Sequence, residues 1–341
     1  GVFDEPGAIA TVRVSVDDSG VQAVDGINSA PSISADGRYA AFQSTSTSIV
    51  AGDSNGVSDI FIHDRDTDED GVFDELAAIS TVRVSVTTAG VQGNLNSSNP
   101  ALSSDGRHIA FESTATNLAS GDTNGVSDIF VHDRDTDGDG TYDEAGFIST
   151  ARISVSSGSA QGNLSSSAPS ISTDGRYIAF TSSASNLISG DTNTVSDIFV
   201  HDRDTDEDGE FDEPSSIDTI RISVSSGGVQ GDLNSSSPSI SSTGRYIAFA
   251  SAATNLTDND TNGVSDIFIH DRDTDADSAF DEPAAISTTL ASAATDGTQG
   301  NLTSSSPGIS SNGKYVAFES SATNLVSGDT NGLVDIFISA P

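Results

Sequence analysis

The stretch PSISADGRYAAF, which begins at Pro31, decides the fold because the chain repeats it four more times. The copies read PALSSDGRHIAF, PSISTDGRYIAF, PSISSTGRYIAF and PGISSNGKYVAF, and they begin at Pro100, Pro169, Pro238 and Pro307. Successive copies are therefore 69 residues apart. A fixed period of this length is typical of a protein built from repeated structural units. We predict one domain, residues 1–341, with repeats that begin near residues 28, 97, 166, 235 and 304.

Each repeat contains four short apolar segments separated by turns rich in Gly, Asn, Asp and Ser. In the first repeat these segments are residues 32–34, 39–44, 60–63 and 81–86, and an Asp-Gly turn joins the first two. No segment has helical periodicity over ten or more residues. Five evenly spaced, four-stranded units predict an all-β fold, a five-bladed β-propeller with four antiparallel strands per blade. An open β-solenoid is the alternative, but solenoid coils usually repeat every 20 to 30 residues or so.

The two ends of the chain share one unit between them. Residues 1–16 match residues 71–86, and the last repeat ends after its third strand. We therefore predict that the N-terminal strand, residues 10–16, completes the last blade. The strand could close a ring within one chain. By strand exchange it could instead enter a neighbouring molecule and produce head-to-tail self-association.

An acidic loop follows the third strand of four repeats, with carboxylates at alternate positions before a Gly, or before Ser278 in the fourth copy. Hard oxygen ligands suit Ca²⁺, and so many like charges within ten residues are costly without a cation. We predict up to four Ca²⁺ sites, the fourth weaker because it lacks the Gly. The candidate ligands are Asp66, Asp68, Asp70, Asp74 and Glu75; Asp135, Asp137, Asp139, Asp143 and Glu144; Asp204, Asp206, Asp208, Asp212 and Glu213; and Asp273, Asp275, Asp277, Asp281 and Glu282.

The register of the ligands has an alternative. Counted from Asp133, DRDTDGDGTYDE also satisfies the EF-hand pattern, with Gly138 at position six and Glu144 at position twelve. The other copies have Glu69, Glu207 or Ala276 at position six, which favours the frame that begins at Asp66. The simplest competing interpretation is a solvated acidic hairpin without a metal.

At this level of detail the repeats resemble a known family. The runs SPSIS-x-DGRYIAF, NL-x-x-GDTNG-x-SDIFVHDR and R-x-SVSS-x-G-x-QGN are similar to the TolB-like, WD-type bacterial propeller repeats of secreted and periplasmic proteins. The acidic loop is similar to the calcium loops of the integrin α-subunit propeller. The resemblance implies a binding or scaffold role. Five repeats are fewer than the six or seven common in TolB-like propellers, and no peptidase domain is attached.

Two other repeated motifs have structural explanations. The motif GD-x-N-x-x-x-D, as in Asp53, Asn55 and Asp59, could form a second metal site or Asx turns that cap backbone amides. Histidines such as His63 recur once per blade, whereas a catalytic site is singular, so we predict no catalytic residues and no enzyme activity. A ring of Gln and Asn in the connections between blades would suit a glycan, which makes a multivalent lectin the alternative function.

Composition narrows the possible partners. With 13 Lys+Arg against 51 Asp+Glu, the net charge is −38, which argues against nucleic-acid binding. No segment approaches the roughly 20 apolar residues that cross a bilayer, so we predict no membrane insertion. The chain contains no Cys and no Met, and its start at Gly1 suggests that a leader was removed. We predict a secreted or cell-surface structural module, an adhesive or cell-envelope scaffold that self-associates or binds a glycan or another cell-surface ligand.

Overall fold

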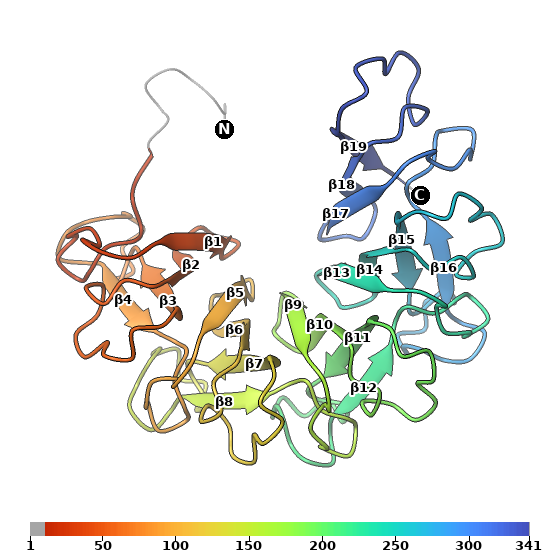
Figure 1. Cartoon of the computed structure of the whole chain (residues 1–341). Coiled ribbons are helices and arrows are strands. Elements are labelled where there is room, and N and C mark those ends of the chain that lie inside the picture. The colour runs from red at the N-terminus through yellow and green to blue at the C-terminus, as the bar shows by residue number, and fades with distance from the viewer. Residues whose placement is uncertain (1–10, 341) are drawn as a thin grey trace.

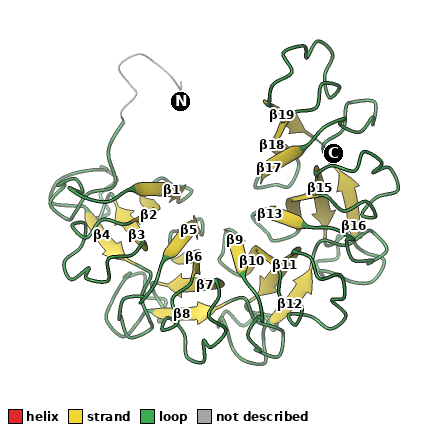
Figure 2. Cartoon of the chain, viewed as in Figure 1, coloured by secondary structure: helices red, strands yellow, loops and turns green. Residues whose placement is uncertain are grey.

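The computed structural model describes residues 11–340, and these residues form nineteen strands and the loops between them, with no helix (Figure 2). No apolar helix long enough to cross a membrane is therefore found among these residues. The strands belong to five antiparallel sheets, in each of which strands neighbouring in sequence are paired. The predicted all-β class and the repeated four-stranded antiparallel sheets are confirmed.

The strands follow the chain in the order of the repeats. The first sheet contains β1 (Asn28–Ile33), β2 (Tyr39–Ser44), β3 (Asp59–Asp64) and β4 (Ser80–Arg83). The second contains β5 (Ser97–Leu102), β6 (His108–Ser113), β7 (Asp128–Asp133) and β8 (Ser149–Arg152). The third contains β9 (Ser166–Ile171), β10 (Tyr177–Ser182), β11 (Asp197–Asp202) and β12 (Asp218–Arg221). The fourth contains β13 (Ser235–Ile240), β14 (Tyr246–Ser251), β15 (Asp266–Asp271) and β16 (Ser287–Leu290). The last contains only β17 (Ser304–Ile309), β18 (Val316–Ser320) and β19 (Asp335–Ser339).

The outer strand is shorter than the sequence pattern predicts. We expected residues 81–86, whereas β4 covers Ser80–Arg83. Beyond Arg83 the amide of Val84 still donates to the carbonyl of Ile60 at 2.9 Å, and the hydroxyl of Ser85 donates to the carboxylate of Asp59 at 2.6 Å. Val86 then pairs with Gln92 in an isolated bridge. The amide of Ile60 donates to the hydroxyl of Ser85 at 3.1 Å, so a side chain takes the place of a backbone acceptor where the regular ladder ends.

Apolar side chains fill the space between successive sheets. Ile60 and Ile62 of β3 are completely buried, and they belong to one cluster with Ile109 and Phe111 of β6. Equivalent clusters join the second sheet to the third, the third to the fourth, and the fourth to the last. Backbone hydrogen bonds also cross each boundary, such as that from Ser104 N to Thr173 O at 2.9 Å. The core of the protein therefore lies between sheets.

The five sheets follow one another around an arc, and the arc is open between the first sheet and the last (Figure 1). The predicted closing strand, residues 10–16, is not part of the last sheet; residue 10 lies outside the described residues, and residues 11–16 pair with no strand of that sheet. Val16 pairs with Gln22, and its carbonyl accepts a hydrogen bond from Thr81 at 2.7 Å, as the carbonyl of Val86 accepts one from Thr150 between the first two sheets. This contact holds the segment on the first sheet, at the other end of the arc.

Candidate metal sites

Each acidic loop connects the third strand of a sheet to the fourth and brings three aspartates together. In the first loop, Asp66 is buried, whereas Asp68 and Asp70 are exposed. One carboxylate oxygen of each lies within 4.8 Å of those of the other two, a spacing that could hold a metal ion. The same arrangement recurs in the other three loops, with Asp135, Asp137 and Asp139; Asp204, Asp206 and Asp208; and Asp273, Asp275 and Asp277.

The buried aspartate organises the loop through the backbone. The carboxylate of Asp66 accepts hydrogen bonds from the amides of Asp70, at 3.2 Å, and Gly71, at 3.0 Å. Gly71 has a φ of 83°, a left-handed conformation that is accessible to glycine without steric cost. In the fourth loop Ser278 adopts the same conformation, with a φ of 77°. Three loops therefore have the residue type that the turn prefers, and the fourth does not.

The carboxylates of each triplet repel one another, which favours protonation of one of them. Desolvation, followed by the charge of Asp70, raises the pKa of Asp68 above its usual value. In the second loop, desolvation and the hydrogen bond with Asp135 raise the pKa of Asp137. Desolvation and the charge of Asp277 raise the pKa of Asp275 in the fourth. A raised carboxyl pKa means that the anionic form lacks a positive partner, which a bound cation would supply.

The Asp-Glu pair that follows each triplet is not part of the aspartate cluster, and its aspartate pairs with an arginine. Arg65 Nε donates to Asp74 Oδ1 at 2.9 Å, and this hydrogen bond lowers the pKa of Asp74. Arg134, Arg203 and Arg272 hold Asp143, Asp212 and Asp281 in the same way. The glutamates of these pairs, Glu75, Glu144, Glu213 and Glu282, are exposed. The signal for this pairing was the single Arg that precedes each triplet.

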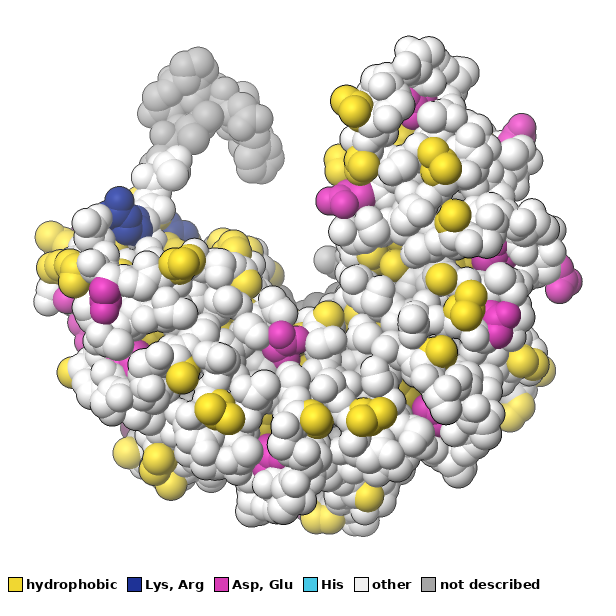
Figure 3. All heavy atoms as spheres, viewed as in Figure 1, with side chains coloured by type: hydrophobic (Ala, Val, Ile, Leu, Met, Phe, Trp, Pro, Cys, Tyr) yellow, Lys and Arg dark blue, Asp and Glu magenta, His cyan; other side chains and the backbone are white. Residues whose placement is uncertain are grey.

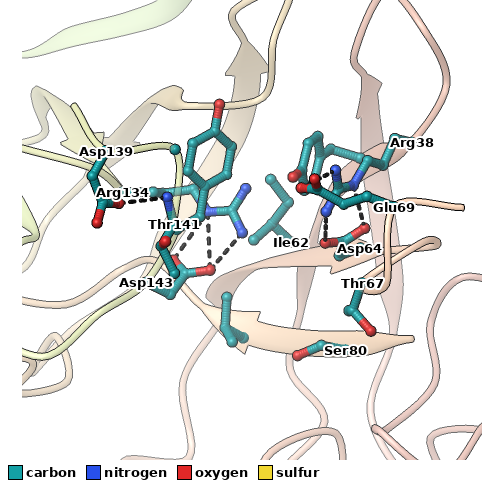
Figure 4. A pocket seen from close by; sticks show the side chains of 14 residues that line it. Arg38, Ile62, Asp64, Thr67, Glu69, Ser80, Arg134, Asp139, Thr141 and Asp143 are labelled. Carbon is teal, nitrogen blue, oxygen red and sulfur yellow. Dashed lines mark hydrogen bonds and ion pairs between the residues drawn. The ribbon is translucent and has the colours of Figure 1, made fainter. Parts of the chain in front are cut away.

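Two of these arginines, Arg134 and Arg272, also contact a tyrosine of the preceding sheet. Arg134 lies between the rings of Tyr39, at 4.8 Å, and Tyr142, at 4.7 Å from the ring centroids. Its Nη1 donates to the carbonyl of Gly106 at 2.9 Å. Figure 4 shows Arg134 with Asp139 and Asp143 on one side of a hollow and Arg38 with Glu69 on the other. This hollow, of about 530 Å³, lies between two consecutive acidic loops, so the second loop is part of the boundary between the first two sheets.

The GD-x-N segments form turns and ion pairs. Asn55 Nδ2 donates to Asp59 Oδ2 at 2.9 Å, and Asn55 Oδ1 accepts a hydrogen bond from the amide of Val57 at 3.2 Å. Arg83 Nη1 lies 3.2 Å from Asp53 Oδ1. The carboxylates are therefore engaged by protein donors, as expected for Asx turns.

The repeated histidines are buried and hydrogen-bonded to threonines. His63 Nδ1 lies 2.8 Å from Thr81 Oγ1, and the second, third and fourth sheets repeat this pair. Burial lowers the pKa of His63 below its usual value, and that of His132, His201 and His270 to about 4. A neutral histidine that bonds the outer strand is a structural element of the first four sheets.

No family model and no curated protein matches the chain. Structures of TolB proteins are among the solved structures similar to it, as the repeat motifs predicted. For TolB from Acinetobacter baumannii the identity is 14% and the TM-score 0.42, with 88% of this chain and 53% of that chain covered. For a putative TolB from Agrobacterium tumefaciens the identity is 17% and the TM-score 0.46, with 92% of this chain and 81% of that chain covered. An α-L-arabinofuranosidase from Lactobacillus brevis is 11% identical, with a TM-score of 0.40 and coverage of 92% and 90%.

Proposed function

We propose that the protein is a secreted, calcium-stabilised structural or adhesive module, a five-bladed propeller without enzymatic activity. The observation that supports this proposal is the fourfold repetition of an aspartate triplet whose carboxylate oxygens lie within 4.8 Å of one another. The triplets recur once in each of the first four sheets, as expected for ions that stabilise a repeated structural unit. A catalytic metal would need a single site with an open position.

Calcium fits these loops better than other divalent ions. Every side-chain donor in the triplets is a carboxylate oxygen, which excludes the nitrogen and sulfur ligands that Zn²⁺ prefers. Mg²⁺ dehydrates reluctantly and demands a near-ideal octahedron, whereas Ca²⁺ accepts irregular shells of six to eight oxygens. Asp66, Asp68 and Asp70 would hold the ion of the first loop, and backbone carbonyls and water would complete its shell. The ion would neutralise charge in the loop and keep its arginine-aspartate pair in place against the neighbouring sheet.

A structural function also agrees with how the connections between sheets use their amides. Asn94 Nδ2 donates to Thr116 Oγ1 at 2.9 Å, and Gln92 Nε2 donates to Ser54 Oγ at 2.9 Å. Amides engaged within the fold are less available for a sugar, which favours a scaffold over the glycan-binding alternative. We further propose that the module self-associates head to tail, with residues 10–16 as the fourth strand of a last sheet.

The proposal is tested by thermal unfolding in millimolar Ca²⁺, in Mg²⁺ and in excess EGTA. Because an ion that binds only the folded state stabilises it by mass action, we expect the highest melting temperature in Ca²⁺ and a marked loss in EGTA. The variant Asp137→Asn should lose part of the gain from Ca²⁺, whereas Asp105→Asn, in the β5–β6 turn, should keep it. Equal melting temperatures in the three buffers would contradict the proposal and would show that the loops are solvated acidic hairpins without a stabilising metal.

A further inference from the structure

The last sheet presents an apolar face that has no neighbour among the described residues. Ile336 and Ile338 of β19 are 70% and 73% exposed, whereas their counterparts in the first sheet, Ile60 and Ile62, are completely buried against the second sheet. Burial of apolar surface stabilises a protein by about 25 cal/mol per Å², so two exposed isoleucines on an edge strand are a surface that gains free energy when a partner covers it. We refer to β19 with the GD-x-N segment that precedes it, residues 326–339, as the terminal surface.

In each of the first three sheets, two polar contacts connect the third strand and the loop before it to the end of the fourth strand and the residues that follow. We refer to these contacts as the polar set. In the first sheet, Arg83 pairs with Asp53, and Ser85 donates to Asp59 at 2.6 Å. The second and third sheets repeat both contacts, with Arg152 and Ser154, and with Arg221 and Ser223. In the fourth sheet Leu290 stands in place of the arginine, and Gln299 donates to Asp260 instead, at 2.7 Å.

The terminal surface has the acidic half of this set without the other half. Asp329 and Asp335 occupy the positions of Asp53 and Asp59. One carboxylate oxygen of Asp329 is buried and accepts no hydrogen bond from residues 11–340, which is also true of Asp53 and Asp191. Those two carboxylates each lie within 4.0 Å of an arginine, whereas Asp329 has no ion pair among residues 11–340. Within the same residues, Asp335 accepts a side-chain hydrogen bond only from its neighbour Asn331, at 3.0 Å. A buried carboxylate oxygen without a partner is costly, so this surface is complete only when a donor binds it.

The missing donors are found at the start of the described chain. Arg13, Ser15 and Gln22 have the same spacing as Arg83, Ser85 and Gln92. Thr81 holds the carbonyl of Val16 on the first sheet as Thr150 holds that of Val86 on the second, at 2.7 and 2.6 Å. The segment therefore lies on the first sheet as the end of a preceding sheet would. Figure 3 shows basic side chains at this end of the arc.

A third complementary pair lies in the first acidic loop. At the first three boundaries an aromatic ring of a loop packs on the residue at the start of the preceding sheet's second strand, as Tyr142 does on Tyr39 with centroids 5.6 Å apart. In the first loop, Arg65 lies 4.8 Å from the ring centroid of Phe73, and no sheet precedes them in the described chain. Tyr315 has the position of Tyr39 in the last sheet and is 52% exposed.

We propose that the terminal surface binds the N-terminal segment and first sheet of a second copy of this chain. Residues 11–16 of the second copy add the fourth strand, with Arg13 against Asp329, Ser15 against Asp335 and Phe73 over Tyr315. A second copy is the occupant because the two surfaces lie at opposite ends of an open arc whose sheets are joined by packed and hydrogen-bonded boundaries (Figure 1). Contacts of this head-to-tail kind repeat from copy to copy. The inference rests on the proposed self-association and gives it its residues.

Cysteine cross-linking tests the register, since the chain has no cysteine of its own. In the first sheet Ile62 lies opposite Val82, so the proposal places Ile338 opposite Val12. Cα atoms opposite each other in antiparallel strands are about 4.5 to 5.5 Å apart, within reach of a disulfide. Val12→Cys and Ile338→Cys are purified separately, mixed in Ca²⁺ and oxidised. We expect a covalent dimer of the mixture, twice the 34.7 kDa of one chain, and much less dimer from either variant alone.

The double variant, with both cysteines in one chain, decides between the two sources of the strand. We expect a ladder of covalent multimers on non-reducing gels. A cross-linked monomer as the main product would show that the chain closes on itself and would overturn the proposal. Failure of both reactions in protein that Ca²⁺ still stabilises would also overturn it, while leaving the calcium proposal intact.

Charge reversal supplies a test without cysteines. Arg13→Asp should reduce association in sedimentation velocity at least about tenfold, the effect of losing one hydrogen bond to a charged group. Asp329→Arg combined with Arg13→Asp should restore it. Ser15→Ala and Ser85→Ala form a matched pair, because only the second removes a contact within the isolated chain. Ser15→Ala should weaken association with no change in melting temperature, and association unchanged in both Arg13→Asp and Ser15→Ala would refute the assignment.

Discussion

Single residues decide how well each acidic loop is formed. Ser278 stands where the other three loops have Gly71, Gly140 and Gly209, and all four adopt a positive φ. The hydrogen bond from Ser278 to Asp273 is 3.3 Å long, whereas that from Gly71 to Asp66 is 3.0 Å. The fourth loop therefore adopts the common conformation at a steric cost.

Replacing this serine should strengthen the fourth loop. We expect Ser278→Gly to raise the free energy of unfolding by about 1 kcal/mol, because glycine adopts the left-handed conformation without strain. The number of Ca²⁺ ions bound at low free Ca²⁺, measured by calorimetry, should also rise. Gly140→Ser is the matched control and should have the opposite effect on both quantities. Equal stability of all three proteins would show that this position does not limit the loop.

The buried histidines should make stability depend on pH. The pKa of His132, His201 and His270 is about 4 in the folded chain, below the usual 6.5. Between these values the unfolded chain binds protons that the folded chain excludes, so stability is complete above pH 6.5 or so and falls as the pH drops. Urea unfolding in EGTA should lose of order 1 kcal/mol for each histidine between about pH 6.5 and 5. A flat profile over this range would mean that the histidines protonate in the folded state.

Residue by residue, the sequence predicted the site in part. The alternate spacing of Asp66, Asp68 and Asp70 predicted a cluster, and the structure brings these three together because their contacts lie within one turn. The assignment of Asp74 as a ligand stays a prediction. The structure pairs it with Arg65, and spacing could not decide which of two positive partners, a metal or an arginine, this carboxylate meets.

At the scale of elements, the outer strand is held by polar side chains as well as by its ladder. Ser154 donates to Asp128, and its hydroxyl accepts a hydrogen bond from the amide of Ile129 at 3.1 Å. All three groups are buried. Burial raises the pKa of Asp128, and the hydrogen bonds from Ser154 and Asn124 lower it. Loss of the hydroxyl would therefore leave Asp128 Oδ1 and the buried amide of Ile129 without this partner, while Asp128 Oδ2 keeps its hydrogen bond from Asn124.

We expect Ser154→Ala to lower the free energy of unfolding by about 1 to 3 kcal/mol, the usual effect of leaving a buried polar group unsatisfied. Chemical denaturation of the variant measures this loss. The control is Ser189→Ala, the same substitution at an exposed serine, which should change stability by less than about 0.5 kcal/mol. Similar stabilities for the two variants would show that the ladder alone holds β8.

The whole molecule combines a repeated architecture with a large negative charge. Its net charge is −38, and four bound Ca²⁺ ions would reduce this but leave the molecule strongly acidic. Self-repulsion of this size destabilises a compact state, and salt screens it. Calcium and monovalent salt should therefore both stabilise the protein partly by reducing the repulsion among its negative charges.

This overlap predicts the effect of salt without calcium. In EGTA we expect the melting temperature to rise as NaCl is added from about 0.01 to 0.5 M, because the Debye length falls from about 30 Å to a few Å. In saturating Ca²⁺ the rise should be smaller. Sucrose, which does not screen charge, should give similar increments in both buffers and serves as the control. An equal response to NaCl in the two buffers would separate calcium binding from the overall charge.

The sequence by itself determined the repeat of 69 residues, the positions of the second and third strands and of the turn before the second, and the clustering of three aspartates. These features depend on contacts between residues close in sequence, which periodicity and turn chemistry encode directly. The first strand, expected at residues 32–34, is Asn28–Ile33. Only the tertiary structure decided the early end of each outer strand and the pairing of Arg65 with Asp74. It also decided the position of residues 11–16 on the first sheet and the open arc. These features depend on which of several competing partners lies nearest in space. The local sequence pattern would be the same whichever partner a residue meets, so it cannot predict the choice.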